Sequence, residues 1–153
     1  MKQQKETLEK IIESVAHMYR LQNRAYIFKR PVEKSFVKGR SVGGVVVGSK
    51  INYHGKAGVD FNGFICGKGQ FIGFETKQIK TTKNFSLQLL HQHQLEELQF
   101  IQKGGGLSFL LIHFLDKERN DFFLVPVDYI VEHNKGFKVR RKKEGQKYKV
   151  VHE

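Results

Sequence analysis

The sequence predicts an α/β fold in which a central mixed β-sheet is flanked by helices and a protruding arm leaves the core. Apolar residues repeat with helical spacing near the N-terminus and again in the middle of the chain. Short apolar stretches separated by turns follow each of these segments, and this order favours helices packed on a sheet. Because the strands are joined first by hairpins and then through a helix, we expect antiparallel and parallel pairs.

A leading amphipathic helix is predicted over residues 6–23. Its apolar residues share helical spacing: Leu8, Ile11, Ile12, Val15, Met18 and Tyr19. The segment AYIFKRP then predicts a strand that Pro31 ends. Residues 32–58 mix Gly, Val and basic residues without a helical period. They predict an extended hairpin that projects from the core as an arm or stalk.

The second helix is predicted to begin after Ser86 as its N-cap and to stop at Gly104. One apolar stripe runs along it: Leu87, Leu90, Leu98 and Ile101. Two strands, 107–115 and 121–126, follow around the polar turn DKERN. A short helix over about 127–133 precedes a basic C-terminal tail, residues 135–153.

Composition favours one domain spanning residues 1–153, with enough chain to bury a core. The net charge of +12 predicts a polyanionic partner, nucleic acid before a membrane surface. No membrane partner is expected, because the apolar run LSFLLIHFL is about half the roughly 20 residues that a membrane helix needs. The single cysteine, Cys66, forms no internal disulfide and favours a reducing cytoplasm. That is a bacterial cytoplasm, or the host's if the gene is phage-borne.

The stretch VDFNGFICGKGQFIGFETKQIK, residues 59–80, predicts two strands joined by a Gly-rich turn. With the turn centred between Gly67 and Lys68, paired residue numbers sum to 135 and Asp60 faces Glu75. Strand alternation puts Lys77 on the same face. An odd-numbered turn would instead move Glu75 off that face.

Two facing carboxylates need a compensating cation, and Mg²⁺ suits hard oxygen ligands. Such an ion could activate a water at a phosphodiester, with Lys77 polarising the phosphate or orienting the water. The alternative is a plain surface ion pair between Glu75 and Lys77.

Polar side chains of the second helix are a further prediction. Gln94 falls on the apolar stripe, and a buried amide needs hydrogen-bond partners. His91 and His93 are predicted to diverge by roughly 200° on the helix and not to share an ion. In the arm, GGVVVGSK nearly matches a phosphate-binding loop, but its last two residues are reversed and no helix follows. No nucleotide cofactor is therefore expected.

The pattern of Asp60 followed by Glu75-Thr76-Lys77 resembles the PD-(D/E)xK nuclease core, without its leading Pro. Three segments, DFNG at 60–63, FETK at 74–77 and HQHQ at 91–94, more specifically resemble RecU-type Holliday junction resolvases. Residues 8–31 resemble that family's first helix and strand. The resemblance implies a restriction-endonuclease-like core, with Asp60, Glu75, Lys77 and Gln94 as catalytic residues. It implies Asp60, Glu75 and Glu9 as metal ligands, with Glu13 as the alternative to Glu9.

The same resemblance implies a homodimeric endonuclease that hydrolyses phosphodiesters of four-way DNA junctions with Mg²⁺, or with Mn²⁺. A related nuclease acting on other branched or duplex DNA, or a non-catalytic basic nucleic-acid-binding protein, are the alternatives. DNA is expected along the arm and the tail, whose basic side chains suit phosphate contacts. The predicted contacts are Lys38, Arg40, Lys50, Lys56, Arg140 and Arg141.

Overall fold

A five-stranded mixed sheet forms the centre of the computed structural model of this chain, with strand order β1-β6-β7-β9-β10. The structure describes residues 7–31, 34–37, 39–47, 50–53, 58–80, 84–116, 120–133, 137–140 and 149–152. The strands of the sheet are β1 (Ala25–Lys29), β6 (Phe61–Ile65), β7 (Gln70–Ile79), β9 (Leu107–Leu115) and β10 (Asn120–Pro126). Strand β7 pairs antiparallel with β6 and parallel with β9, which confirms the predicted mixed sheet.

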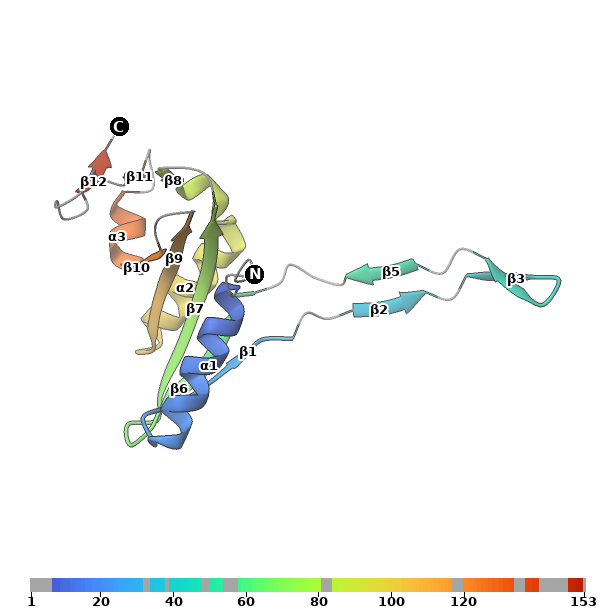
Figure 1. Ribbon diagram of the computed structural model, residues 1–153, viewed down its shortest axis with the longest axis horizontal. Helices are drawn as coiled ribbons and strands as arrows, with labels where there is room; N and C mark the ends of the chain where they lie inside the picture. The colour runs from blue at the N-terminus through green and yellow to red at the C-terminus, as the bar shows by residue number, and fades with distance from the viewer. Residues whose placement is uncertain are drawn as a thin grey trace, which may run out of the picture.

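Helices cover both faces of this sheet, as predicted (Figure 1). Helix α1 (Leu8–Leu21) packs Leu8 and Ile12 against Phe61, Phe74 and other apolar residues of one face. On the other face lie α2 (Gln92–Lys103) and α3 (Val127–Glu132). Strand alternation separates the two apolar layers, because neighbouring residues of β7 and β9 point to opposite faces.

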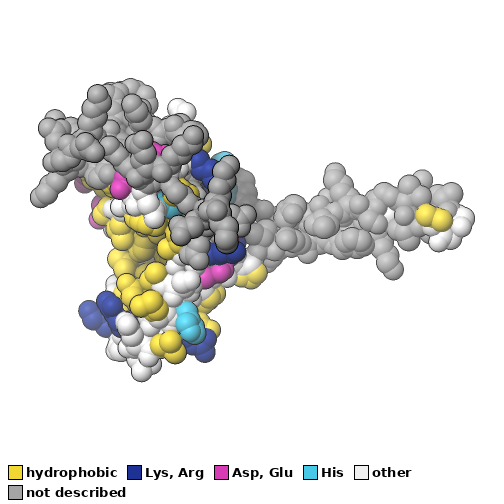
Figure 2. All heavy atoms as spheres, in the orientation of Figure 1, with side chains coloured by type: hydrophobic (Ala, Val, Ile, Leu, Met, Phe, Trp, Pro, Cys, Tyr) yellow, Lys and Arg dark blue, Asp and Glu magenta, His cyan; other side chains and the backbone are white. Residues whose placement is uncertain are grey.

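Helix α1 leaves the β10 end of its face open. The side chains of Phe122 and Leu124, which alternate along β10, are 44% and 59% exposed. Figure 2 shows hydrophobic side chains gathered on the visible face of the core. Among the described helices, none is long and apolar enough to cross a membrane.

The predicted arm is a two-part hairpin between β1 and β6. Strand β2 (Lys34–Val37) pairs antiparallel with β5 (Lys50–Tyr53), and β3 (Arg40–Val42) pairs antiparallel with β4 (Val45–Val47). At the tip, Gly43 and Gly44 adopt φ angles of 62° and 81°, a conformation that favours glycine in a tight hairpin turn. In Figure 1 these ladders extend from the core as a narrow projection.

The second helix begins later than predicted. The Oγ of Ser86 accepts from Gln88 N at 3.4 Å, but it starts the 3-10 turn Leu87–Leu89 rather than an α-helix. The buried residue Leu90 takes an extended conformation (φ −91°, ψ 116°), which redirects the chain so that His91 becomes the N-cap of α2. The helix ends at Gly104, as predicted.

Strands also form in the C-terminal region, where the sequence predicted only a basic tail. A three-stranded sheet has the order β12-β11-β8 and contains β8 (Asn84–Ser86), β11 (Phe137–Arg140) and β12 (Lys149–His152). Alternation of apolar and basic residues in FKVR, together with the β-branched pair Val150 and Val151, fits such a sheet. The basic region is thereby joined by its backbone to the segment that precedes α2.

Candidate functional site

The β6–β7 hairpin has the predicted register. Its ladder runs from Ile65 opposite Gln70 to Phe61 opposite Phe74, and each pair of residue numbers sums to 135. The connecting turn, 66–69, has four residues, and Gly67 and Gly69 take positive φ angles of 79° and 62°. An even-numbered turn was the condition for this register, and the structure meets it.

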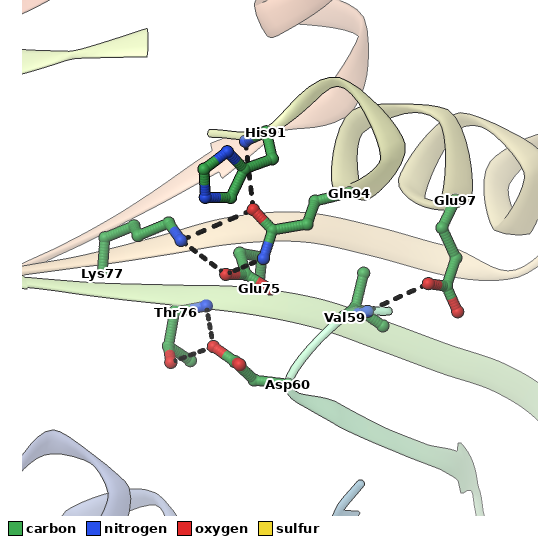
Figure 3. Close-up of polar contacts among 8 residues, drawn as sticks. All are labelled: Val59, Asp60, Glu75, Thr76, Lys77, His91, Gln94 and Glu97. Carbon is green, nitrogen blue, oxygen red and sulfur yellow. Dashed lines mark hydrogen bonds and ion pairs between the residues drawn. The ribbon is translucent and has the colours of Figure 1, made fainter. Parts of the chain in front are cut away.

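Asp60 lies one residue beyond the end of this ladder, in a bend. Its Oδ2 accepts hydrogen bonds from Thr76 N at 2.9 Å and from Thr76 Oγ1 at 2.6 Å (Figure 3). The carboxylate thus accepts a β7 backbone N–H, which is the role that a strand carbonyl plays along the ladder. Asp60 is therefore fixed beside the Glu-Thr-Lys segment through Thr76, and not as a ladder partner of Glu75.

The departure of the chain from β7 has a visible cause. The N–H of Val59 donates to Oε2 of Glu97 on α2 at 3.0 Å (Figure 3). Because Val59 is hydrogen-bonded to Glu97 of the helix, the β6–β7 ladder stops at Phe61. The side chain of Asp60 then accepts the Thr76 N–H in place of a strand carbonyl.

Glu75, Lys77 and Gln94 form one hydrogen-bonded cluster between β7 and α2 (Figure 3). Oε1 of Glu75 accepts from Lys77 Nζ and from Gln94 Nε2, each at 2.7 Å. Oε1 of Gln94 accepts from His91 N at 3.1 Å and from Lys77 Nζ at 3.5 Å. The predicted buried amide is confirmed, and its partners belong to the predicted site.

Glu75 is 1% exposed, so the Glu75–Lys77 contact is not the plain surface pair that the sequence left as an alternative. Burial raises the pKa of the Glu75 carboxyl, and the nearby charge of Asp60 raises it further. The hydrogen bond and charge of Lys77 lower the pKa but do not cancel these effects. The carboxyl thus lies in surroundings that supply too little positive charge for its ionised form.

The donor set fits a small divalent cation. Oε2 of Glu75 is buried and has no hydrogen-bond partner among the residues that the structure describes. Asp60 adds a second carboxylate nearby, and Mg²⁺ often takes only one or two protein carboxylates while it keeps several waters. Within the described ranges, no group of three or more His, Cys, Asp or Glu residues gathers around one point. Asp60 and Glu75 are therefore the two carboxylates that could hold such an ion.

Glu9 forms an ion pair with Lys29 of β1. Lys29 Nζ contacts Oε2 of Glu9 at 2.5 Å, and both side chains are largely exposed. The hydrogen bond that Lys29 donates to Glu9 raises the pKa of Lys29, the charges of Glu9, Glu13 and Asp60 raise it further, and burial acts in the opposite direction. Lys29 therefore lies within the field of both candidate helix carboxylates and of Asp60.

Three of the predicted DNA contacts lie in described strands of the arm and of the C-terminal sheet. Arg40 lies in β3, Lys50 in β5 and Arg140 in β11. Lys38, Lys56 and Arg141 lie outside the described residues.

Three residues of the site were not singled out from the sequence: Thr76, His91 and Glu97. Thr76 is the middle residue of Glu-x-Lys, where no residue type is demanded. His91 was expected to diverge from His93, but the two rings stack with centroids 5.6 Å apart. Because His91 is an extended N-cap (φ −70°, ψ 148°), helical geometry does not govern its direction. Glu97 had a findable signal, since it follows Gln94 by three residues, on neighbouring helix positions.

Comparison with known proteins gives one family. The family described as Recombination protein U (RecU) matches residues 3–152. The Holliday junction resolvase RecU of Shouchella clausii is 29% identical over 139 residues, which cover 88% of this chain and 64% of the relative. The protein of that name from Staphylococcus carnosus is 31% identical over 125 residues, which cover 78% of this chain and 56% of the relative. This chain thus matches about 60% of the length of these relatives, and it belongs to the RecU family.

Proposed function

We propose that this protein is a metal-dependent endonuclease that resolves Holliday junctions by hydrolysing phosphodiester bonds. The observation that carries the proposal is the buried Glu75 carboxylate, whose Oε2 has no partner among the described residues, beside Asp60 and Lys77. Membership of the RecU family supports it, and relatives matched over about 60% of their length are named Holliday junction resolvases.

Asp60 and Glu75 would hold the cation, Mg²⁺ or Mn²⁺, through the oxygens that the protein leaves open. When bound, such an ion supplies positive charge that activates a water and stabilises the leaving oxygen of a phosphodiester. Glu9 is the proposed third ligand, and it is free to contribute only when its ion pair with Lys29 opens.

Lys77 and Gln94 have separate proposed roles beside the two metal-binding carboxylates. Gln94 donates to Oε1 of Glu75 and so directs Oε2 toward the cation. The ammonium of Lys77 balances the buried charge of Glu75, and its side chain is 21% exposed, so it is accessible from solvent. We propose that it donates to the phosphate under attack or orients the attacking water. In the reaction a water oxygen would lose a proton to solvent and bond to phosphorus, while the bond from phosphorus to the leaving oxygen breaks and that oxygen takes up a proton.

The arm and the C-terminal sheet are the proposed DNA-binding elements, with Lys38, Arg40, Lys50, Lys56, Arg140 and Arg141 as phosphate contacts. Net charge of +12 supports salt-dependent DNA binding. A homodimer would present two sites related by two-fold symmetry, which matches the near two-fold symmetry of a four-way junction. A DNA substrate implies that the protein works in the bacterial cytoplasm.

The deciding experiment is a cleavage assay on four-way junctions, replication forks and linear duplex at equal concentration, with Mg²⁺, Mn²⁺ or EDTA. We expect metal-dependent cleavage of the junction, its loss in Asp60→Asn and Glu75→Gln, and normal cleavage by the exposed control Glu96→Gln. Intact junctions at every metal concentration would contradict the proposal. If linear duplex is cut as fast as the junction, the proposed hydrolysis stands but the proposed junction specificity is wrong.

A further inference from the structure

Two segments that are distant in the sequence meet at Glu97 of α2, where the arm joins the core. The first is Arg30, directly after β1, and the second is the pair Gly58 and Val59, directly before β6. Oε1 of Glu97 accepts a hydrogen bond from the guanidinium of Arg30, and Oε2 accepts from Val59 N at 3.0 Å. Both ends of the arm are thus bound to one carboxylate.

These contacts close a ring around the backbone of Asp60. The N–H of Arg30 donates to the carbonyl oxygen of Asp60 at 2.8 Å. The side chain of Arg30 returns to Glu97, and Glu97 returns to Val59, the neighbour of Asp60. The peptide group that follows the Asp60 Cα is therefore held through Arg30, and the peptide group between Gly58 and Val59 is held directly by Glu97.

Gly58 is packed against the same contacts. A Cβ atom at Gly58 would overlap Nη1 of Arg30 and Oε2 of Glu97. Any larger residue there has to push the ion pair apart, so Gly58 gives a second, independent way to disturb it.

Helix α2 thereby contacts the Glu75 carboxylate and the backbone next to Asp60 through residues three apart. Gln94 donates to the side chain of Glu75, and Glu97 holds the backbone that carries Asp60. We propose that Glu97 is a positioning residue that sets the place of the Asp60 carboxylate relative to Glu75. The inference rests on the proposed function, in which these two carboxylates hold the divalent cation.

The test compares Glu97→Ala and Glu97→Gln with the matched control Glu96→Ala. Glu96 is the preceding residue of α2, is exposed, and accepts from Gln92 Nε2 at 3.1 Å, away from the ring. Mn²⁺ affinity is measured by calorimetry on each folded protein without DNA. The Mn²⁺ concentration that gives half-maximal junction cleavage is measured separately, together with the amide resonance of Val59.

Groups that hold metal ligands in place typically change metal affinity by about 10- to 100-fold when removed. We expect Glu97→Ala to weaken Mn²⁺ binding roughly tenfold, to raise the half-maximal Mn²⁺ concentration similarly, and to shift the Val59 amide. Glu97→Gln keeps an acceptor for Val59 N–H but loses the negative charge that pairs with Arg30. We therefore expect a smaller loss of Mn²⁺ affinity than in Glu97→Ala. Glu96→Ala should match the wild type.

Gly58→Ala should weaken Mn²⁺ binding in the same way, and the double variant with Glu97→Ala should be little worse than either alone. Such non-additivity is expected when two changes break one contact. If Glu97→Ala does not fold, Glu97→Gln and Gly58→Ala carry the comparison.

The two proposals fail differently. If folded Glu97 variants bind Mn²⁺ as the wild type does and need the same Mn²⁺ concentration for half-maximal cleavage, the positioning role is overturned. The proposed junction-cleaving function would not be affected by that result. Loss of Mn²⁺ affinity in a protein whose wild type cuts no junction would uphold positioning and contradict the proposed function. A wild type that binds no Mn²⁺ would overturn the inference.

Discussion

The side-chain amide of Gln94 donates to Oε1 of Glu75 at 2.7 Å, and the other oxygen of that carboxylate, Oε2, is buried without a partner among the described residues. An amide at this position satisfies one oxygen and leaves the second available. Because Gln94 also accepts from the backbone N–H of His91, its orientation is fixed by the start of the helix. The first turn of α2 therefore determines which way the Glu75 carboxylate is open.

Replacing Gln94 by methionine keeps the volume and removes both polar groups. Lys77 and His91 N lose an acceptor and Glu75 loses a donor, so we expect stability to fall by about 1–2 kcal/mol and junction cleavage to fall about 10-fold or more. Urea denaturation and single-turnover cleavage measure the two effects. Gln92→Met is the matched control, because Gln92 is exposed on the same helix turn. Equal cleavage by both variants would contradict the role given to Gln94.

Glu75→Gln should stabilise the protein at neutral pH while it abolishes cleavage. Folding raises the pKa of Glu75 above its ordinary value of 4.5, mainly through burial. The folded state therefore binds this proton more tightly than the unfolded state, and stability is lost as pH rises through the interval above 4.5. A glutamine removes that loss and still accepts from Lys77.

Thermal unfolding across a pH series measures this effect. The melting temperature of Glu75→Gln should exceed that of the wild type near pH 7, and the difference should shrink as pH falls below 4.5. A glutamine variant that is less stable than the wild type at pH 7 would show that the Lys77 ion pair outweighs burial.

Thr76→Val should weaken the site without changing its shape. Valine lacks the hydroxyl that donates to Oδ2 of Asp60 at 2.6 Å, although the backbone N–H remains. We expect a loss of about 1 kcal/mol in stability and a fall of roughly tenfold in junction cleavage. Thr76→Ser restores the donor and should restore most of the rate. Failure of serine to rescue would mean that the methyl group, and not the hydroxyl, matters at position 76.

Gly63→Ala should damage the sheet, and this explains the glycine of the DFNG segment. A Cβ atom at Gly63 would overlap the carbonyl oxygen of Tyr26 on the neighbouring strand β1. Because backbone must move, we expect a loss of roughly 3 kcal/mol in the free energy of unfolding, measured in urea. Gly104→Ala is the control, since its Cβ would lie 3.5 Å from the nearest atoms, an ordinary contact. Similar losses in both variants would refute this explanation.

Local pattern predicted the hairpin and the buried cluster well. The turn at 66–69 and strand alternation were enough to give the register and to put Glu75 and Lys77 on one face. Helical spacing was enough to place Gln94 inward.

Details that depend on distant residues were not predictable. The partner of Asp60 is Thr76 because Glu97, 37 positions further along the chain, draws Val59 out of the ladder. Likewise Ser86 is a good N-cap by residue type, but it caps only the 3-10 turn. Burial of Leu87 and Leu90 redirects the chain there, so that His91 is the N-cap of α2.

Asp60 also finishes the sheet, since its Oδ2 is the acceptor of the Thr76 N–H. An alanine at this position would strip out a structural acceptor together with a negative charge, and both losses would reach the neighbouring Glu75. Asparagine separates them, because its amide oxygen still accepts from Thr76 while the charge is gone. The chemistry of this carboxylate is therefore read most cleanly from Asp60→Asn, and the gap between Asn and Ala reports what the same side chain contributes to the fold.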